Sequence, residues 1–330
     1  MRDSAITCTI DLDADGVHHG HLRLPYSRDD SAWGSVMIPI TVAKNGTGPT
    51  ALLTGANHGD EYEGPFALVE LAATIQAKDL SGRVIIVPFM NEPAFAAGTR
   101  TSPIDQGNMN RAFPGRPDGT VTEKIADYFQ RYLLPLADVV LDFHSGGNTL
   151  DFLPFAASHV LEDKEQEARC SAAREAFNAP FSIQMLEIDS AGMYDDAAEA
   201  MGKVFVTTEL GGGGTTTPEV IEIARKGLRN VLIHATILRG ELSRGPTRHL
   251  SQSDAACFHF SPGRGLVEFC VSLGEPVHKG DLLARIWATE QTGQPPLDII
   301  AKTDGLLTTR HAKGLIQPGD CLAVLAREIL

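Results

Sequence analysis

Three short motifs in the middle of the chain carry side chains that bind metal ions or transfer protons. They are Gly-Ala-Asn-His58-Gly-Asp-Glu61, Asp-Phe-His144-Ser-Gly-Gly and Glu209-Leu-Gly-Gly-Gly-Gly. A histidine and a glutamate three residues apart can face one ion from a tight turn, giving ligands at about 2 Å. That pair alone is weak evidence, because the spacing often arises by chance and the turn could simply cap the following helix.

All three motifs come at or just after the end of an expected strand. The apolar runs at 50–54, 138–143 and 204–208 are typical of buried strands. Ligands bind at the carboxyl ends of the strands in open α/β sheets, and glycines there let the backbone approach a ligand closely. One histidine at a strand end would be an ordinary finding, but three such coincidences at one edge are improbable. We therefore expect the side chains of the three motifs to converge.

The predicted set of ligands is that of hydrolytic rather than structural zinc. Two histidines and one carboxylate leave one position of a tetrahedral zinc open for water. We expect one Zn²⁺ per chain, held by His58, Glu61 and His144. Zinc lowers the pKa of water towards about 7, and Glu209 is expected to be the general base that takes the proton and returns it to the departing amine. Cobalt or iron would suit the same ligands in vitro.

Two loops supply cations near these motifs. Asn110 and Arg111 lie in a loop with glycine and proline, and the planar guanidinium group suits a substrate carboxylate. Arg100 lies in the loop after the expected strand at 83–88, where it could polarise the scissile carbonyl and stabilise the developing oxyanion. Either arginine could instead be a solvated surface charge.

The elements around the motifs predict an α/β domain with an additional β-domain. Residues 1–45 alternate polar and apolar positions, as in an antiparallel ribbon of short strands packed on the next domain. In 46–244, the catalytic domain, apolar strands alternate with helical stretches, which indicates a largely parallel sheet. The expected helices span 65–75, 122–134 and 218–238.

The last part of the chain, 245–330, has almost no helical periodicity and contains a quasi-repeat. Gly265-Leu-Val-Glu-Phe precedes Gly-Asp-Leu-Leu-Ala, and Gly305-Leu-Leu-Thr precedes Gly-Asp-Cys-Leu-Ala. This pattern predicts a duplicated strand–turn–strand unit in a small β-barrel or sandwich.

Composition excludes some classes of function. A formal charge of −14 argues against nucleic acid, because few cations could neutralise a run of phosphates. The sequence has no apolar run of about 18 residues that would span a membrane and no secretory signal, so a cytoplasmic location is expected. Its five scattered cysteines lack a CxxC spacing, which favours neither a disulfide framework nor a thiolate metal site.

The motifs, in their order, resemble those of the succinylglutamate desuccinylase/aspartoacylase family, itself similar to zinc carboxypeptidases. The matching motifs are His58-Gly-Asp-Glu61, Asn110-Arg111-x-Phe-Pro-Gly, Asp142-x-His144 and Glu209-x-Gly. The resemblance implies a carboxypeptidase-like three-layer α/β/α fold with a mixed, largely parallel sheet, and a C-terminal barrel like the biotinyl/lipoyl domains. It also implies the zinc ligands and the catalytic Glu209 given above, substrate carboxylate binding by Asn110 and Arg111, and a catalytic role for Arg100.

The implied reaction is hydrolysis of the amide of a small-molecule N-acyl amino acid. Within the family, the N-terminal ribbon, Gly55–Gly64 and Thr99–Pro103 look most like the bacterial N-acetyl-L-2,4-diaminobutyrate deacetylases of ectoine breakdown. The ammonium group of such a substrate would favour an acidic neighbour, although a solvated loop is the simpler interpretation of the acidic residues available. These are Glu187, Asp189, Asp195 and Asp196.

Several alternatives remain open at this point. The chain could act on another N-acyl amino acid, as desuccinylases and aspartoacylases do, or on peptides, as metallocarboxypeptidases do. It could also be a metabolite-binding protein on the same fold, which is disfavoured because no ligand position is missing. The sequence fixes neither the acyl group nor the amine side chain, and a homo-oligomer is an open alternative. The C-terminal domain lacks the lysine-bearing hairpin of a carrier, so we expect it to form a lid or wall over the site or an oligomer contact.

Overall fold

The computed structural model describes residues 3–185, 191–252 and 254–329. Fifteen strands of these residues form one mixed sheet, with the order β1-β2-β3-β5-β4-β6-β10-β8-β9-β11-β19-β17-β14, while β7 pairs with β17 and β12 with β19. Its centre is parallel and consists of β5 (Gly82–Val87), β4 (Thr50–Thr54), β6 (Val139–His144) and β10 (Val204–Glu209). The three strands predicted to end in the motifs are therefore neighbours, and their carboxyl ends share one edge.

The N-terminal ribbon extends one side of this sheet. It contains β1 (Thr7–Cys8), β2 (Gly16–Pro25) and β3 (Ser35–Asn45). β2 and β3 pair antiparallel along their whole length, and β3 pairs antiparallel with β5. Leu22 and Leu24 are buried while their neighbours Arg23 and Pro25 are exposed, which is the two-residue period of a half-buried strand. The predicted antiparallel ribbon is confirmed, but its strands are longer than expected.

Helices cover both faces of the central strands. On one face, α1 (Glu63–Thr74), α4 (Lys164–Phe177) and α6 (Pro218–His234) share an apolar core with Leu53 and Leu141. On the other face, α3 (Val121–Tyr128) and α5 (Tyr194–Glu199) share a second core with Leu52 and Val140. Consecutive residues of a strand point to opposite faces, so β4 and β6 contribute to both cores. The fold is thus mixed α/β, as predicted.

Several elements differ from the sequence prediction. The helix expected at 122–134 is α3, which continues as a π-helical turn at Phe129–Leu133 and a 3₁₀ turn at Leu134–Leu136. The helix expected at 218–238 ends at His234. Elements without a sequence prediction are α2 (Glu92–Ala97), β7 (Leu150–Phe152), β8 (Phe155–His159), α4 and β9 (Phe181–Met185). β8 runs antiparallel to β10, and the ribbon and the C-terminal strands add further antiparallel pairs. The parallel parts of the sheet are β5–β4–β6–β10 and β8–β9–β11.

The C-terminal strands form two sheets that share a core. Four strands make a separate antiparallel sheet in the order β16 (Leu297–Ile300), β15 (Leu282–Trp287), β13 (Gly265–Phe269) and β18 (Leu315–Ile316). The others belong to the large sheet: β11 (Arg248–Gln252), β12 (Phe258–Phe260), β14 (Pro276–Val277), β17 (Gly305–His311) and β19 (Cys321–Glu328). Buried Leu283, Ile286, Leu307 and Leu325 join the two sheets in one apolar cluster. The predicted small barrel is not confirmed.

The two segments of the quasi-repeat fold alike and exchange a short strand. β13–β14–β15 and β17–β18–β19 each contain a long strand, a short strand, a turn and a second long strand. β14 of the first unit pairs with β17 of the second, and β18 of the second pairs with β13 of the first. Because β11 pairs with both β9 and β19, the large sheet continues past residue 245, and a domain boundary there stays a prediction.

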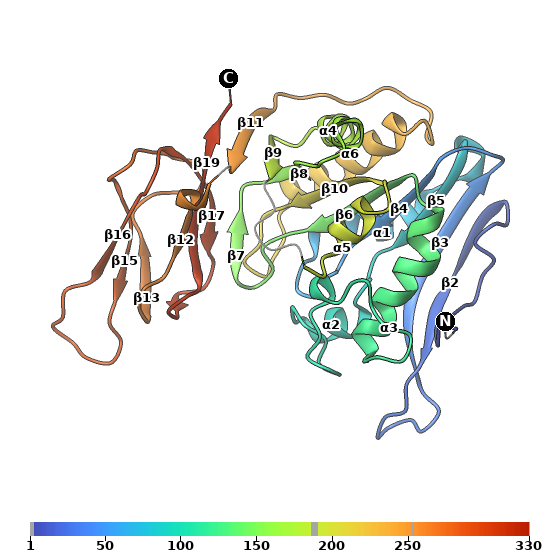
Figure 1. Cartoon of the computed structure of the whole chain (residues 1–330), viewed down its shortest axis with the longest axis horizontal. Helices are drawn as coiled ribbons and strands as arrows, with labels where there is room; N and C mark the ends of the chain where they lie inside the picture. Colours follow the sequence, from blue (N-terminus) through green and yellow to red (C-terminus); the bar gives the residue numbers. More distant parts are fainter. Residues whose placement is uncertain (1–2, 186–190, 253, 330) are drawn as a thin grey trace.

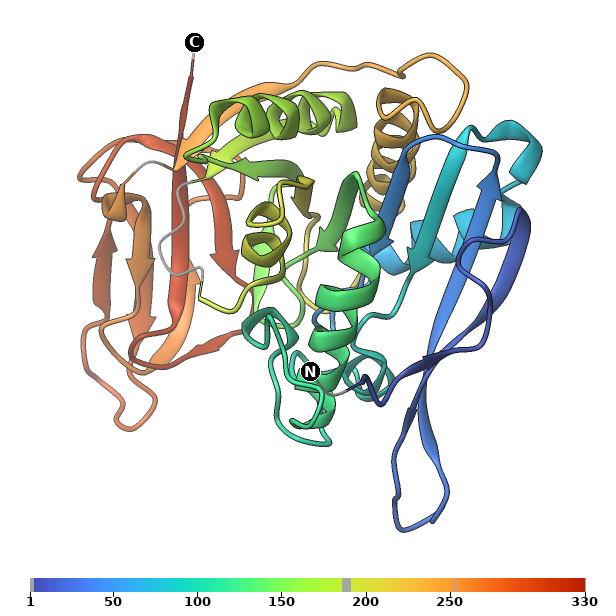
Figure 2. The ribbon, with the colours of Figure 1, turned by 45° about the vertical axis from the view of Figure 1, so that its right-hand side comes forward.

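The ribbon and the C-terminal strands lie at opposite ends of the molecule, with the helix-covered strands between them (Figure 1). Figure 2 shows the same order from a second direction, with the blue ribbon on the right and the orange and red strands on the left. Within the described part of the chain, the helices are too short or too polar to cross a bilayer. All five cysteines are free thiols.

Candidate active site

The parallel strands at the centre of the sheet fix two of the predicted side chains, Glu209 and His144, together with Asp142. Glu209 at the end of β10 is in register with His144 at the end of β6. Asp142, two residues earlier on β6, is in register with Thr54 at the end of β4. Residues two apart on a strand point to the same face, so Asp142 and His144 lie side by side. The sheet itself thus brings the second and third motifs together.

The turn between β4 and α1 brings the first motif to the same edge. Backbone hydrogen bonds from Met90 to Gly55 (2.9 Å) and from Asn91 to Ala56 (3.0 Å) anchor this turn to the loop after β5. Ala56 has a φ of +50°, a left-handed conformation that costs an alanine about 1–2 kcal/mol. These hydrogen bonds hold the strained turn, and His58 follows it by two residues.

His58, Glu61 and His144 converge in the way that the sequence predicts. One candidate ligand atom from each lies within 4.8 Å of the other two. The Nδ1 atom of His58 is 2.7 Å from Oε1 of Glu61, and the Nδ1 atom of His144 is 3.0 Å from Oε2 of the same carboxylate. All three side chains are buried or nearly so. Burial alone would raise the pKa of Glu61, but the two imidazoles beside it lower that pKa well below its usual range.

The outer nitrogen of each imidazole has an oxygen acceptor of its own. Nε2 of His144 is 2.8 Å from Oδ2 of Asp142, and Nε2 of His58 is 3.2 Å from Oδ1 of Asn108. The hydroxyl group of Thr54 donates to the other oxygen of Asp142 at 2.6 Å. Such partners place the ring proton on Nε2 and leave the Nδ1 lone pair to face a metal ion. The donor set therefore fits a zinc-type ion at Nδ1 of both rings and the Glu61 carboxylate.

Glu209 is a half-buried residue beside this cluster, and its Oε2 atom is buried. Its Oε2 atom has no hydrogen-bond partner among the described residues. Burial, together with the nearby Glu61 carboxylate, raises the pKa of Glu209 to about 8. Burying a second carboxylate without a partner is costly unless a cation or a proton compensates it. This unpaired oxygen is a second observation that a positive ion fits here.

All of the predicted site residues line one pocket of about 210 Å³. Arg100 is half-exposed, and its Nη1 atom is 3.6 Å from Oε1 of Glu61. The side-chain oxygen of Asn110 accepts a hydrogen bond from the backbone of Tyr194 at 2.9 Å, which leaves its NH₂ group for a ligand. Arg111 donates from Nη1 to the backbone oxygen of Asn110 at 2.6 Å. The pocket thus joins the metal-type cluster to groups that suit an anion.

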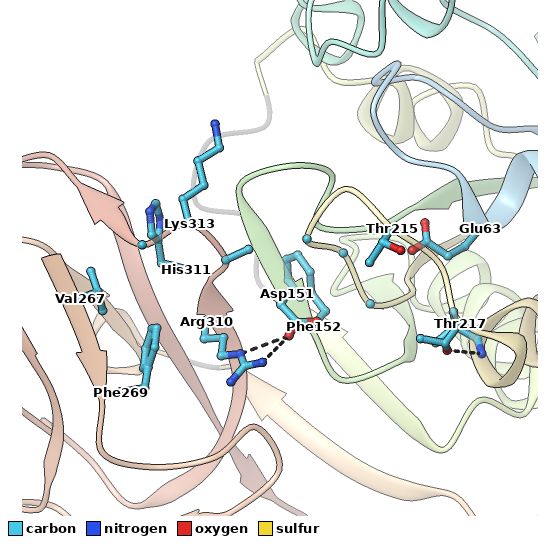
Figure 3. A pocket seen from close by; sticks show the side chains of 16 residues that line it. Glu63, Asp151, Phe152, Thr215, Thr217, Val267, Phe269, Arg310, His311 and Lys313 are labelled. Atoms are coloured by element: carbon cyan, nitrogen blue, oxygen red, sulfur yellow. Dashed lines mark hydrogen bonds and ion pairs between the residues drawn. The ribbon is translucent and has the colours of Figure 1, made fainter.

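A larger cavity of about 600 Å³ lies elsewhere, between the 211–213 glycine turn and the strands β13 and β17. Figure 3 shows its wall, where Arg310 of β17 contacts Asp151 of β7 at 2.9 Å. None of the predicted site residues lines it. The smaller pocket is therefore the candidate active site.

Some residues that contact the proposed metal ligands or line the pocket had no predicted role. Asp142 was part of a motif, and the two-residue strand period could have identified it as the partner of His144. Asn108 and His159 reach the site from distant loops and strands, and no local pattern marks them. Of the acidic candidates, Asp195 lines the pocket and is buried, whereas Asp196 is exposed. Glu187 and Asp189 lie outside the described residues.

Comparison with known proteins agrees with this geometry. Residues 47–235 match the profile of the succinylglutamate desuccinylase/aspartoacylase catalytic domain. The chain belongs to the succinylglutamate desuccinylase/aspartoacylase family. The match spans the strands β4, β6 and β10 and all of the motifs that define the pocket. The resemblance inferred from those motifs is therefore confirmed.

Similar members of the family cover nearly the whole chain. A protein from Halomonas elongata named N-alpha-acetyl-L-2,4-diaminobutyric acid deacetylase is 53% identical, and the match covers 100% of this chain and 97% of that protein. The product-bound structure of the ectoine utilization protein EutE (DoeB) from Ruegeria pomeroyi is 66% identical, with a TM-score of 0.98 over 99% of this chain and 100% of that one. A structure described as a succinylglutamate desuccinylase from Silicibacter sp. TM1040 is 64% identical, with a TM-score of 0.97 over 100% of both chains.

Proposed function

We propose that this protein is an amide hydrolase that converts N-acetyl-L-2,4-diaminobutyrate to acetate and L-2,4-diaminobutyrate. Its membership of the family and the names of the Halomonas and Ruegeria relatives support this reaction in ectoine breakdown. The observation that carries the proposal is the convergence of His58, Glu61, His144 and Glu209 in one small pocket. A cytoplasmic location and a homo-oligomeric state stay predictions.

One zinc ion per chain is proposed at Nδ1 of His58, the carboxylate of Glu61 and Nδ1 of His144. When bound, zinc supplies a positive charge that polarises a carbonyl oxygen and makes water more acidic. Asp142 and Asn108 hold the two imidazole rings in the orientation that such an ion needs. The volume of about 210 Å³ is below the range of drug-sized pockets, which favours a small substrate over a long peptide.

The chain's own residues then perform three tasks. Asn110 and Arg111 hold the substrate carboxylate and so place the amide in the pocket. Glu209 takes a proton from the attacking water and returns it to the amine nitrogen as the C–N bond breaks. Arg100 donates to the carbonyl oxygen, where negative charge develops during attack. Glu209 suits this role because its Oε2 atom has no hydrogen-bond partner among the described residues and is therefore available to water and substrate.

The C-terminal strands are proposed to support the wall of the pocket that β7 forms. Leu150 and Phe152 of β7 line it, and β7 pairs antiparallel with β17. The contact between Arg310 and Asp151 ties the same two strands together. A wall of this kind narrows the entrance and disfavours peptides, in agreement with a carboxypeptidase-like fold that acts on single amino acids.

A Glu209→Gln substitution tests the proposed base. The amide cannot accept the proton from water, so we expect kcat for N-acetyl-L-2,4-diaminobutyrate to fall by about 10²–10⁴-fold. The zinc content of the purified variant should equal that of the wild type. Glu219→Gln, at an exposed position on α6, is the matched control and should retain full activity. A Glu209→Gln protein that hydrolyses the substrate at the normal rate would falsify the assignment.

A succinylglutamate desuccinylase is the second candidate, because the similar Silicibacter structure carries that description. The two activities separate in a panel of N-acetyl-diaminobutyrate, N-succinyl-glutamate, N-acetyl-aspartate and a short peptide with a free carboxyl terminus. We expect the acetylated diaminobutyrate to give the highest kcat/KM. A preference for the succinyl substrate would reverse the order of the two candidates, and binding of these compounds without turnover would favour a metabolite-binding protein.

A further inference from the structure

Asp195 places a buried carboxylate in the wall of the candidate active site. It lies in α5, lines the same pocket as His144 and Glu209, and is only 6% exposed. Its Oδ1 atom accepts a hydrogen bond from the backbone of Asp196 at 2.8 Å. The other oxygen, Oδ2, is 3.8 Å from Nε2 of His159, which is beyond hydrogen-bond distance.

The charges around Asp195 leave this side of the pocket negative. His159 also lines the pocket, and its Nδ1 atom lies 3.0 Å from Oε1 of Glu199. Among the described residues, two carboxylates thus lie beside one imidazole, an excess of negative over positive charge. Burial raises the pKa of Asp195, as expected for a carboxylate with too few cationic partners. A cation bound in the pocket would compensate this charge.

The start of α5, which carries Asp195, is attached to the loop that carries the predicted carboxylate-binding groups. The backbone of Tyr194, next to Asp195, donates to the side chain of Asn110 at 2.9 Å. The backbone of Phe113 donates to Gly192 at 3.0 Å, and a Cβ atom on Gly192 would lie 2.7 Å from the backbone oxygen of Arg111. This close packing holds an anionic group and a carboxylate-binding pair together in one pocket.

Such a pocket matches an amino acid that carries a carboxylate and a second, positive group. Arg111 and Asn110 suit the carboxylate, and Asp195 suits an ammonium group. Met185, Met193 and Leu150 line the rest of the pocket and provide an apolar surface for methylene and methyl groups. The name of the Halomonas relative specifies the N-alpha-acetyl isomer. In that isomer the side-chain amine is not acetylated and is positively charged at neutral pH.

We propose that Asp195 binds the side-chain ammonium of the substrate and thereby selects N-acyl amino acids with a short basic side chain. This assignment rests on the proposed function. The structure describes two of the acidic candidates. Asp195 lines the pocket, whereas Asp196 is exposed to solvent. Asp195 is therefore the acidic candidate that can face the substrate. Asp195 is thus a determinant of specificity, separate from the groups that hold the metal ion and move the proton.

The test compares two substrates of the same length on the zinc-loaded protein. N-acetyl-L-norvaline has a methyl group where N-acetyl-L-2,4-diaminobutyrate has its ammonium group. We expect the wild type to prefer the diaminobutyrate substrate. In Asp195→Asn, kcat/KM for that substrate should fall by about 100-fold, because the ammonium loses a buried charged partner, whereas kcat/KM for the norvaline substrate should change less than about 3-fold. Asp196→Asn is the matched control and should keep the preference of the wild type.

Other outcomes separate this assignment from the proposed function. If the wild type hydrolyses both substrates and Asp195→Asn keeps the same ratio, or lowers both rates equally, the assignment of Asp195 is wrong and the deacetylase activity stands. If the wild type hydrolyses neither substrate, the proposed function itself is contradicted.

A binding measurement on the wild type does not depend on whether the variant folds. By calorimetry, L-2,4-diaminobutyrate should bind at least about 10-fold more tightly than L-norvaline, as expected for one charged contact in a buried site. Equal affinities would overturn the proposal.

Discussion

The imidazole of His144 is held at both of its ring nitrogens. Asp142 accepts from Nε2, and Glu61 lies at Nδ1. Asp142 in turn accepts from the hydroxyl group of Thr54, so its carboxylate cannot turn away from the ring without losing that hydrogen bond. The orientation of one ligand therefore depends on residues from two neighbouring strands, β4 and β6. Asp142 is a positioning residue, since it acts on the metal ion through His144.

An Asp142→Asn substitution should loosen the orientation of the His144 ring. The amide presents one acceptor instead of two, so either Thr54 or His144 loses its partner. We expect the affinity for zinc to fall by about 10–100-fold, measured by competition with a chromogenic chelator. The control is Asp138→Asn, which should leave zinc affinity unchanged. Asp138 lies just before the other end of β6, and its carboxylate accepts a hydrogen bond from the backbone of Thr50. Unchanged zinc affinity in Asp142→Asn would contradict the role of Asp142.

Sequence patterns predicted the side chains at strand ends and the loop residues Arg100, Asn110 and Arg111, but not Asn108 and His159. His58, His144 and Glu209 follow apolar runs, and the rule that parallel strands share a carboxyl edge was enough to bring them together. Asn108 reaches His58 from a loop fifty residues away in the chain. His159 lies on β8, whose small and polar residues Ala156, Ala157 and Ser158 gave no apolar strand signal. The contacts of such residues depend on tertiary packing, which a local pattern does not contain.

At the scale of elements, the site depends on how closely α1 lies against β6. Gly64, in the first turn of α1, has space for no side chain, because a Cβ atom there would be 2.1 Å from Cβ of Phe143. Phe143 directly precedes His144 on β6, and Gly64 comes three residues after Glu61. This glycine contact therefore sets the distance between two of the proposed metal ligands.

We predict that Gly64→Ala lowers both stability and zinc affinity. The added methyl group must displace α1 from β6, and we expect a loss of about 2 kcal/mol in the free energy of unfolding. This loss is larger than the stability that alanine gains over glycine through its higher helix propensity. A lower melting temperature by calorimetry and weaker zinc binding would agree. Val69→Ala, at an exposed position of the same helix, controls for side-chain size. A Gly64→Ala protein as stable as the wild type would show that α1 has more room than the structure indicates.

The elements that sequence analysis missed share a physical cause. The helix α4 buries Gln166 and Arg174 together with Cys170, Ala173 and Phe177, so its inner face is only partly apolar and its periodicity is weak. The strands of the parallel centre are buried on both faces and therefore have continuous apolar runs, which is why the run predicted at 50–54 coincides with β4. The sequence therefore predicted the strands that are apolar and buried on both faces, and missed the helix α4, which buries polar side chains.

At the scale of the whole molecule, a strand that lines the pocket also pairs with the C-terminal strands. The segment Leu150–Phe152 leaves the central strands and pairs with β17 of the C-terminal strands. Pairing of segments that are far apart depends on long-range register, so the sequence indicated a β-rich region after residue 244 but not that its strand β17 would pair with β7, which lines the pocket. The N-terminal ribbon, by contrast, pairs with its immediate neighbour and was predicted.

The central claim is that three side chains from two segments hold one metal ion in this pocket, and metal analysis of the purified protein tests it most directly. The account predicts about one zinc per chain in the wild type and in Glu209→Gln, and less than about a tenth of that in His144→Ala, because two remaining ligands bind too weakly to retain the ion. Size-exclusion chromatography would show that the variant is folded. A wild type that carries no metal after gentle purification, or a His144→Ala protein that carries as much as the wild type, would contradict the account.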